Sequence, residues 1–230
     1  MIQAIFFDFN GVIIDDEPLQ MAAYKEVLRD YGIELTESDY YSALGLDDKG
    51  FVRATFARYE KQLTDEMLKT ILDGKLIRHR KLIEHELPLF PGVVTFLKSA
   101  ARHYSICLVS MASPAEIEHV LERANLQHLF SVVVSSADVN VCKPAPDCYQ
   151  SALRKLNERR RTGGKSTLAS TECLAIEDSP PGIEAGRLTG MHTLGITNTV
   201  SAEQLRAAGA EVVSASLADW TTATVRHVFQ

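Results

Sequence analysis

Short apolar runs alternate with amphipathic segments along most of this chain, and this alternation restricts the fold more than any other feature. The runs are rich in β-branched and aromatic residues and cover residues 4–9, 105–110, 131–135, 173–177 and 193–196. The amphipathic segments cover residues 93–103, 114–125, 147–157, 181–190 and 202–208. Strands that alternate with helices in this way predict a doubly wound α/β core, in which helices cover both faces of a parallel sheet.

Residues 17–86 interrupt this alternation, because they contain only helical patterns. The expected helices cover residues 19–31, 37–42, 47–59 and 64–86. The segment 87–92, which contains two prolines and a glycine, then leads back to the α/β pattern. We therefore predict a core domain made of residues 1–16 and 88–230. An all-helical cap subdomain, residues 17–87, is inserted after the first strand.

Local signals predict two helix starts and one loop. Ser113 and Ser201 are each followed three residues later by Glu or Gln, which is the spacing of a capping box. Arg159–Thr171 is polar and contains glycine, so we predict a loop there. Within it, Gly163-Gly164-Lys165-Ser166 lacks the earlier glycine of a phosphate-binding P-loop, because position 159 is Arg. We therefore reject a P-loop.

The composition argues against several classes of protein. The chain has 230 residues and a net charge of −6, whereas nucleic-acid binding needs clustered excess Lys and Arg. No apolar stretch approaches the length of a membrane-spanning helix, and the N-terminus shows no secretory signal pattern. The four cysteines have no CxxC spacing, so we expect reduced packing residues. We expect a cytoplasmic enzyme that is a monomer or weak dimer.

Polar residues stand where several of the predicted strands end. Asp8, Ser110 and the pair Glu177–Asp178 all occupy such positions, and Lys143 follows another strand. In open α/β sheets, ligands bind beyond the carboxyl ends of the strands. Adjacent buried carboxylates are costly unless a cation neutralises them, and three acidic groups in one cleft suit Mg²⁺. Each residue alone also fits a turn, a helix cap or a surface position, so the prediction depends on their convergence.

Four segments resemble the motifs of the haloacid dehalogenase (HAD) superfamily. They are Asp8-Phe9-Asn10-Gly11-Val12, Val109-Ser110, Lys143-Pro144-Ala145-Pro146-Asp147 and Glu177-Asp178-Ser179-Pro180-Pro181-Gly182-Ile183. The chain as a whole is most similar to the β-phosphoglucomutase-like sugar-phosphate phosphatase branch. This resemblance implies a Rossmann-like core with a mobile cap, an aspartyl-phosphate intermediate and a Mg²⁺-dependent phosphohydrolase. Its substrate would be a small phosphorylated metabolite such as a sugar phosphate.

The resemblance also implies a role for each matching residue. Asp8 would be the nucleophile and a metal ligand, Asn10 would offer its backbone carbonyl to the metal, and Asp178 would bind the metal directly. Glu177 would bind the metal or orient metal-bound water. Ser110 and the adjacent Met111 would bind the transferring phosphoryl group, and Lys143 would balance its charge. Phosphoryl transfer in general requires this combination of positioning and positive charge.

Asn10 departs from the family pattern, which usually has Asp at this position as the acid and base. An amide cannot exchange a proton near neutral pH, and general acid–base help is worth about 10²–10⁴-fold in rate. We therefore expect slowed phosphate hydrolysis. The alternatives are a carbon–phosphorus or carbon–halogen hydrolase, since such members also lack this Asp, and a catalytically weakened phospho-ligand-binding protein. The Glu177–Asp178 pair argues against the metal-independent dehalogenases.

Two further candidates lie in the hinge and the cap. Asp16 stands where the family often has Thr or Ser, and we hypothesise that it approaches the leaving group when the cap closes. The alternative is a solvated hinge carboxylate. Lys49 follows a segment that resembles the substrate-specificity loop, so it either contacts substrate or is an exposed residue at a helix start. The Arg that binds a second phosphate in the phosphoglucomutase branch has no clear counterpart.

Overall fold

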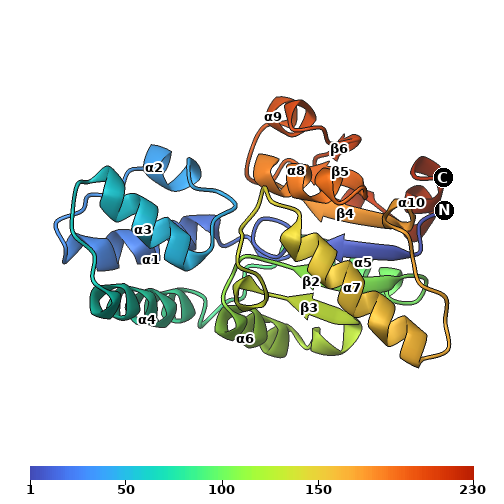
Figure 1. The fold of residues 1–230 in the computed structure, drawn as a ribbon, viewed down its shortest axis with the longest axis horizontal. Helices are drawn as coiled ribbons and strands as arrows, with labels where there is room; N and C mark the ends of the chain where they lie inside the picture. Colours follow the sequence, from blue (N-terminus) through green and yellow to red (C-terminus); the bar gives the residue numbers. More distant parts are fainter.

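The computed structural model describes all 230 residues and shows an α/β core with a helical cap to one side (Figure 1). The sheet has six parallel strands in the order β3-β2-β1-β4-β5-β6. Their bounds are β1 Ala4–Phe7, β2 Ser105–Val109, β3 Val132–Val134, β4 Cys173–Glu177, β5 His192–Ile196 and β6 Val212–Ser214. The strand order reverses between β1 and β4, as in doubly wound folds. The predicted fold class is confirmed.

Helices cover both faces of this sheet. They are α5 Val93–Ala100, α6 Pro114–Ala124, α7 Asp147–Thr162, α8 Pro180–Leu188, α9 Ala202–Ala207 and α10 Thr222–Val228. On one face, Ile5 and Phe7 of β1 belong to the apolar cluster that includes residues of α5, α6 and α10. On the other face, Ala4 and Phe6 belong to the cluster that includes α7 and α8. Burial on both faces explains why the whole strand is apolar.

The cap contains four helices with an apolar core of their own. They are α1 Glu17–Arg29, α2 Glu37–Tyr41, α3 Asp48–Arg58 and α4 Asp65–Leu82, and their shared core includes Tyr24, Phe51 and Ile71. Two chain segments connect the cap to the sheet domain. These segments pair with each other, because the Asp15 N–H donates to the Pro88 carbonyl at 2.7 Å and Ile14 forms an antiparallel bridge with Leu89.

The structure differs from the sequence prediction at two places in the core. β6 and α10 were not predicted, because β6 is a short edge strand whose residues are only half-buried and therefore lack a continuous apolar run. The predicted loop Arg159–Thr171 is wrong at its start, since α7 continues to Thr162. Three arginines occupy the last turn of α7, where positive charge interacts favourably with the helix dipole.

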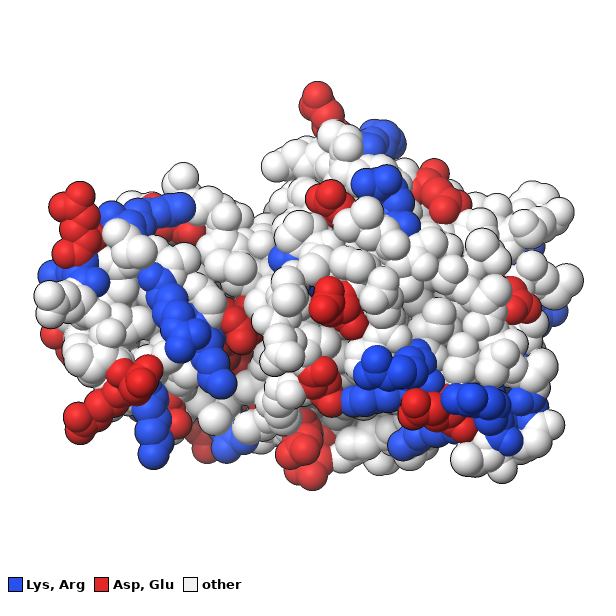
Figure 2. Space-filling model, in the orientation of Figure 1, with Lys and Arg blue, Asp and Glu red and all other residues white.

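The two predicted helix starts are confirmed. Both capping boxes are present, with the Ser113 and Ser201 hydroxyls accepting from the backbone three residues later. All four cysteines are free. None of the helices combines the length and the apolar character that a membrane crossing requires. Figure 2 shows Lys and Arg side chains gathered along the exposed side of α7, interrupted by acidic residues.

Candidate active site

The carboxyl ends of β1 and β4 bring three acidic side chains together. Asp8 follows β1, Glu177 ends β4 and Asp178 comes next, and the register Phe7–Ile176 places Asp8 opposite Glu177. One oxygen of each carboxylate lies within 4.8 Å of the other two. Glu177 and Asp178 are buried, whereas Asp8 is partly exposed. Asp8 is therefore the carboxylate of this cluster that an incoming ligand meets first.

Lys143 supplies the only side-chain positive charge in this cluster. Its Nζ lies 3.0 Å from Asp8 Oδ1 and 2.6 Å from Glu177 Oε1, and it also donates to the Val109 carbonyl at 3.3 Å. Burial by itself lowers the pKa of Lys143, but the Asp8 and Glu177 carboxylates outweigh burial and hold the pKa above its usual value. Lys143 is therefore charged at neutral pH.

Glu177 is anchored by a second donor that sequence analysis missed. The Tyr149 hydroxyl of α7 donates to Glu177 Oε1 at 2.6 Å. An aromatic residue in an amphipathic helix is expected to pack in the core, which Tyr149 also does, so the sequence carries no separate signal for this contact. Glu177 Oε2 is buried and has no hydrogen-bond partner.

The acidic cluster fits a divalent cation. Burial, reinforced by Asp8, raises the pKa of Glu177 to about 8, and the same causes raise the pKa of Asp178. The cluster thus contains three acidic groups and one lysine, which pairs with two of them, and one carboxylate oxygen is left without a donor. Hard cations such as Mg²⁺ prefer this all-oxygen set of ligands. The residues present therefore match the metal that the sequence predicted.

Gly11 allows the chain to turn tightly against this cluster. Its φ is +75°, a conformation that residues with a side chain rarely adopt. A Cβ at this position would lie 1.8 Å from Asp178 Oδ2. The turn is held by Asn198, whose Nδ2 donates to the Gly11 carbonyl at 2.7 Å. Glycine is thus required here both by backbone conformation and by the closeness of the carboxylate.

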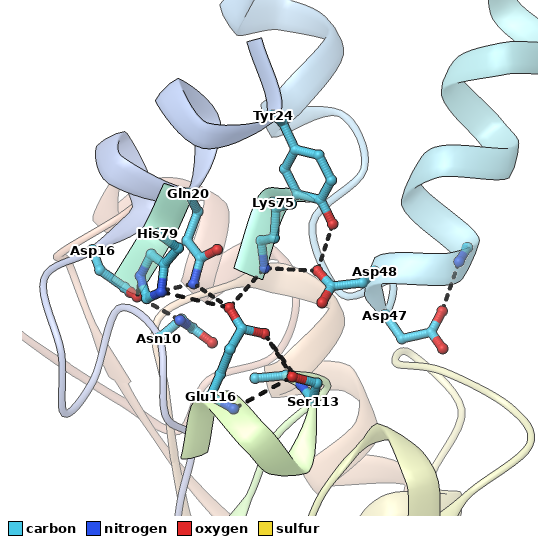
Figure 3. A network of polar contacts seen from close by, with 12 residues as sticks. Asn10, Asp16, Gln20, Tyr24, Asp47, Asp48, Lys75, His79, Ser113 and Glu116 are labelled. Atoms are coloured by element: carbon cyan, nitrogen blue, oxygen red, sulfur yellow. Dashed lines mark hydrogen bonds and ion pairs between the residues drawn. The ribbon is translucent and has the colours of Figure 1, made fainter. Parts of the chain in front are cut away.

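The Asn10 side chain is bound to the hinge. Its Nδ2 donates to Asp16 Oδ1 at 2.8 Å, while Asp16 Oδ2 accepts from Gln20 at 3.0 Å and lies 2.7 Å from His79 Nε2 (Figure 3). Asp16 is completely buried. The alternative of a solvated hinge carboxylate is therefore wrong, because three polar partners from the core loop, α1 and α4 enclose this group.

A cleft lies between the acidic cluster and the cap. From the core, the lining residues include Asp8, Asn10, Ser110, Met111, Lys143 and Asp178. From the cap, they include Glu17, Gln20, Tyr24, Tyr40, Asp48 and Lys75. Three candidates from the sequence do not line the cleft. Asp16 lies behind Asn10, and Glu177 is completely buried. Lys49 is exposed in the first turn of α3.

Two buried residues of α4 were not predicted near the site: Lys75, which lines the cleft, and His79, which contacts Asp16. Lys75 and His79 continue the buried stripe of α4 at the spacing set by Ile71, so they occupy positions where apolar residues are expected. Each is almost completely buried. Charged residues in register with an apolar stripe were the available signal, because such groups are rarely buried without a partner.

The raised pKa values predict a pH-dependent response to Mg²⁺. Without metal, folded Glu177 keeps its proton up to about pH 8, whereas the unfolded carboxyl loses it near its ordinary value of 4.5. The free energy of unfolding therefore falls as pH rises through that window. Mg²⁺ replaces the proton, so we expect it to raise Tm more at pH 8 than at about pH 5.5. Thermal unfolding with and without Mg²⁺ measures this, and equal shifts at both pH values would contradict it.

Residues 5–196 match the family model of the haloacid dehalogenase-like hydrolases. The chain belongs to this family. A phosphorylated carbohydrates phosphatase of Thermotoga maritima is 26% identical over 84% of this chain and 84% of its own length. A fructose-1-phosphate phosphatase of Escherichia coli is 26% identical, over 84% of this chain and 95% of its own. The β-phosphoglucomutase structure of Clostridium difficile shares the HAD-like fold, with a TM-score of 0.86, 20% identity and coverage of 100% and 97%.

Proposed function

We propose that this protein is a Mg²⁺-dependent phosphohydrolase of sugar phosphates, which acts through an aspartyl-phosphate on Asp8. The observation that carries the proposal is the position of Asp8. Its partly exposed carboxylate faces the cleft, lies 3.0 Å from a buried lysine and belongs to a cluster that fits a divalent cation. The carbohydrate-phosphate activities named for two relatives support the substrate class.

In the first step, an Asp8 oxygen forms a bond to phosphorus while the bond from phosphorus to the sugar oxygen breaks. Lys143 stabilises the negative charge that builds up on the phosphoryl oxygens. Ser110 is buried beside the cleft and its Oγ already accepts from the Ala112 N–H at 2.9 Å, so its hydroxyl hydrogen is available to a phosphoryl oxygen. Met111 lines the same wall.

Asp8, the Asn10 backbone carbonyl and Asp178, with Glu177 beside them, would hold Mg²⁺, which would supply further positive charge to the phosphoryl group. In the second step, water attacks phosphorus and the bond from phosphorus to Asp8 breaks. Inorganic phosphate leaves, and the Asp8 carboxylate is regenerated. The sugar oxygen must gain a proton in the first step, and the attacking water must lose one in the second.

Asn10 cannot carry these protons, so we assign part of this task to the hinge. The hinge hypothesis named Asp16, but Glu17 is the hinge carboxyl that lines the cleft with Asp8 and Asn10. Its Oε2 accepts from the Tyr40 hydroxyl at 2.6 Å. Burial, reinforced by the Asp16 and Asp8 charges, raises the pKa of Glu17 to about 7. A carboxyl that is half-protonated at neutral pH is suited to proton transfer.

Glu17→Gln is expected to lower kcat/KM for sugar phosphates by roughly 10-fold or more, because the proton donor is lost. An activated aryl phosphate, whose leaving group needs little protonation, is expected to change by less than about 2-fold. Glu26→Gln is the matched control, since Glu26 lies on the exposed side of the same helix. Equal losses on both substrates, or none on sugar phosphates, would remove Glu17 from this role.

Phosphate release from a panel of sugar phosphates and an aryl phosphate, with and without Mg²⁺, tests the proposed function directly. We expect Mg²⁺-dependent turnover of both substrate types. Acid quenching during aryl phosphate turnover is expected to trap one phosphoryl group per chain, released by hydroxylamine and mapped to Asp8. Silence on every substrate would reject the phosphohydrolase and favour the carbon–phosphorus, carbon–halogen or ligand-binding alternatives.

A further inference from the structure

Four helices contribute side chains to one wall of the cleft, and a buried lysine stands among these side chains. Lys75 Nζ of α4 lies 3.0 Å from Asp48 Oδ1 of α3 and 2.7 Å from Glu116 Oε1 of α6 (Figure 3). The Tyr24 hydroxyl of α1 donates to the same Asp48 oxygen. Lys75 and Glu116 are almost completely buried, and all four residues line the cleft. We call these four residues the distal wall.

The distal wall has no spare positive charge. Burial alone lowers the pKa of Lys75, but Asp48 and Glu116 outweigh it and raise the pKa, so the lysine is charged. Burial opposes ionisation of Glu116, yet Lys75 lowers its pKa to about 2, so Glu116 is charged too. Burial raises the pKa of Asp48, which adds either no charge or one negative charge. The wall is therefore neutral or negative at neutral pH.

No other cation in the cleft supplies the positive charge that the distal wall lacks. The lining contains Lys75 and Lys143 and no arginine or histidine. Lys143 is already paired with Asp8 and Glu177. Glu17 and Asp47 also line the cap side and are acidic. A ligand group that reaches the distal wall thus meets carboxylate oxygens, an amide and phenol rings.

A separate observation shows that the wall has hydrogen-bonding capacity left for a ligand. Gln20 of α1 is 5% exposed, and its Nε2 donates to Asp16 at 3.0 Å and to Glu116 at 3.1 Å. Its Oε1 is buried, has no partner and points towards the Lys75 side of the network (Figure 3). A buried acceptor without a donor is costly, and an O–H or N–H group of a ligand would satisfy it.

We propose that the distal wall selects monophosphates whose remainder is an uncharged polyhydroxyl chain or ring, and that it excludes substrates with a second phosphate. Hydroxyl groups donate to the free oxygen of Gln20, to the carboxylates and to the Tyr24 oxygen, whose own hydrogen is bound to Asp48, and they accept from Lys75. A second phosphate would meet a neutral or acidic wall that offers no unpaired cation, which is unfavourable in a partly buried site. This inference rests on the proposed phosphohydrolase function.

Matched pairs of substrates test the selection on the unmodified protein with Mg²⁺. Fructose 1-phosphate is compared with fructose 1,6-bisphosphate, and glucose 6-phosphate with glucose 1,6-bisphosphate. We expect kcat/KM to be at least about 10-fold higher for the monophosphate of whichever pair is turned over, because like charges brought together across a binding site are strongly disfavoured. Equal or better use of the bisphosphates would overturn the proposal.

Asp48→Asn separates the charge of the wall from its shape. The amide keeps an acceptor for Tyr24 and Lys75 but removes a carboxylate. We therefore expect the ratio of kcat/KM for the monophosphate to kcat/KM for the bisphosphate to fall roughly 5-fold. Asp73→Asn is the control, because Asp73 is exposed on α4 two residues before Lys75. If Asp48→Asn and Asp73→Asn preferred monophosphates over bisphosphates to the same degree, Asp48 would not set the selection. Asp48→Ser provides a second test if Asp48→Asn unfolds at a lower temperature than the parent.

An aryl phosphate distinguishes failure of this inference from failure of the proposed function. If the protein turned over the aryl phosphate but did not prefer monophosphates over bisphosphates, the proposed selection by the distal wall would be rejected. The proposed phosphohydrolase function would stand. Absence of aryl phosphate turnover would reject both, because the selection rests on the reaction.

Discussion

Asn10→Asp is expected to raise kcat/KM for sugar phosphates by about 10²-fold or more, since it supplies the acid and base that the amide cannot provide. The new carboxyl occupies the place of the Asn10 amide, which lines the cleft with Asp8. It would protonate the sugar oxygen in the first step and deprotonate water in the second. For an activated aryl phosphate, the first step is expected to change little, because that leaving group needs little protonation.

The same change places two acidic groups side by side. The Asn10 Nδ2 that now donates to Asp16 at 2.8 Å would be replaced by an oxygen, so one proton must be shared between the two carboxyls. We expect the free energy of unfolding to fall by about 1–3 kcal/mol as that hydrogen bond changes. The protein thus has a structural reason to keep an amide at this position as long as Asp16 is buried beside it.

Initial rates on both substrate types, together with thermal unfolding, test this prediction. Asn140→Asp is a suitable control, because Asn140 is exposed and does not line the cleft. A faster variant that is less stable agrees with both expectations. Unchanged sugar phosphate turnover at unchanged stability would mean that the group at position 10 takes no part in proton transfer.

The sequence predicted the parts of this structure that follow from local periodicity. Strands buried on both faces are apolar throughout, so β1 and β4 and their helices were visible as alternating patterns. Parallel strands end at one edge of the sheet, and this geometry brings Asp8 and Asp178 together although 170 residues separate them. Topology therefore turned residues that are distant in sequence into one candidate site.

The contacts between the cap and the core could not be predicted in the same way. Asp16, His79 and Glu116 come from three separate elements, and each has an ordinary explanation as a hinge or helix residue. Their partners depend on how the cap sits on the core, which no local pattern specifies. The same limit applies to Tyr149, because its hydroxyl meets Glu177 only once α7 is packed on the sheet.

Lys143→Met is expected to lower the free energy of unfolding of the metal-free protein by about 3–5 kcal/mol, because it removes one partner of a buried ion pair. Lys143 lies within 3.0 Å of both Asp8 and Glu177, and its side chain is almost completely buried. Methionine has a similar length and can fill the same space without the charge. Phosphoryl transfer is expected to slow by about 10²–10³-fold, since a cation aimed at the phosphoryl oxygens is lost.

Lys155→Met is the matched control for this change. Lys155 lies on α7 and pairs with Asp138 at the surface, where both side chains are about one-third exposed. Surface ion pairs contribute about 0–1 kcal/mol, so we expect little change in stability or activity. Mg²⁺ should restore more stability to Lys143→Met than to the parent, because it supplies charge to the same carboxylates. If Mg²⁺ stabilised both proteins equally, the acidic cluster and the metal site would have to be separate.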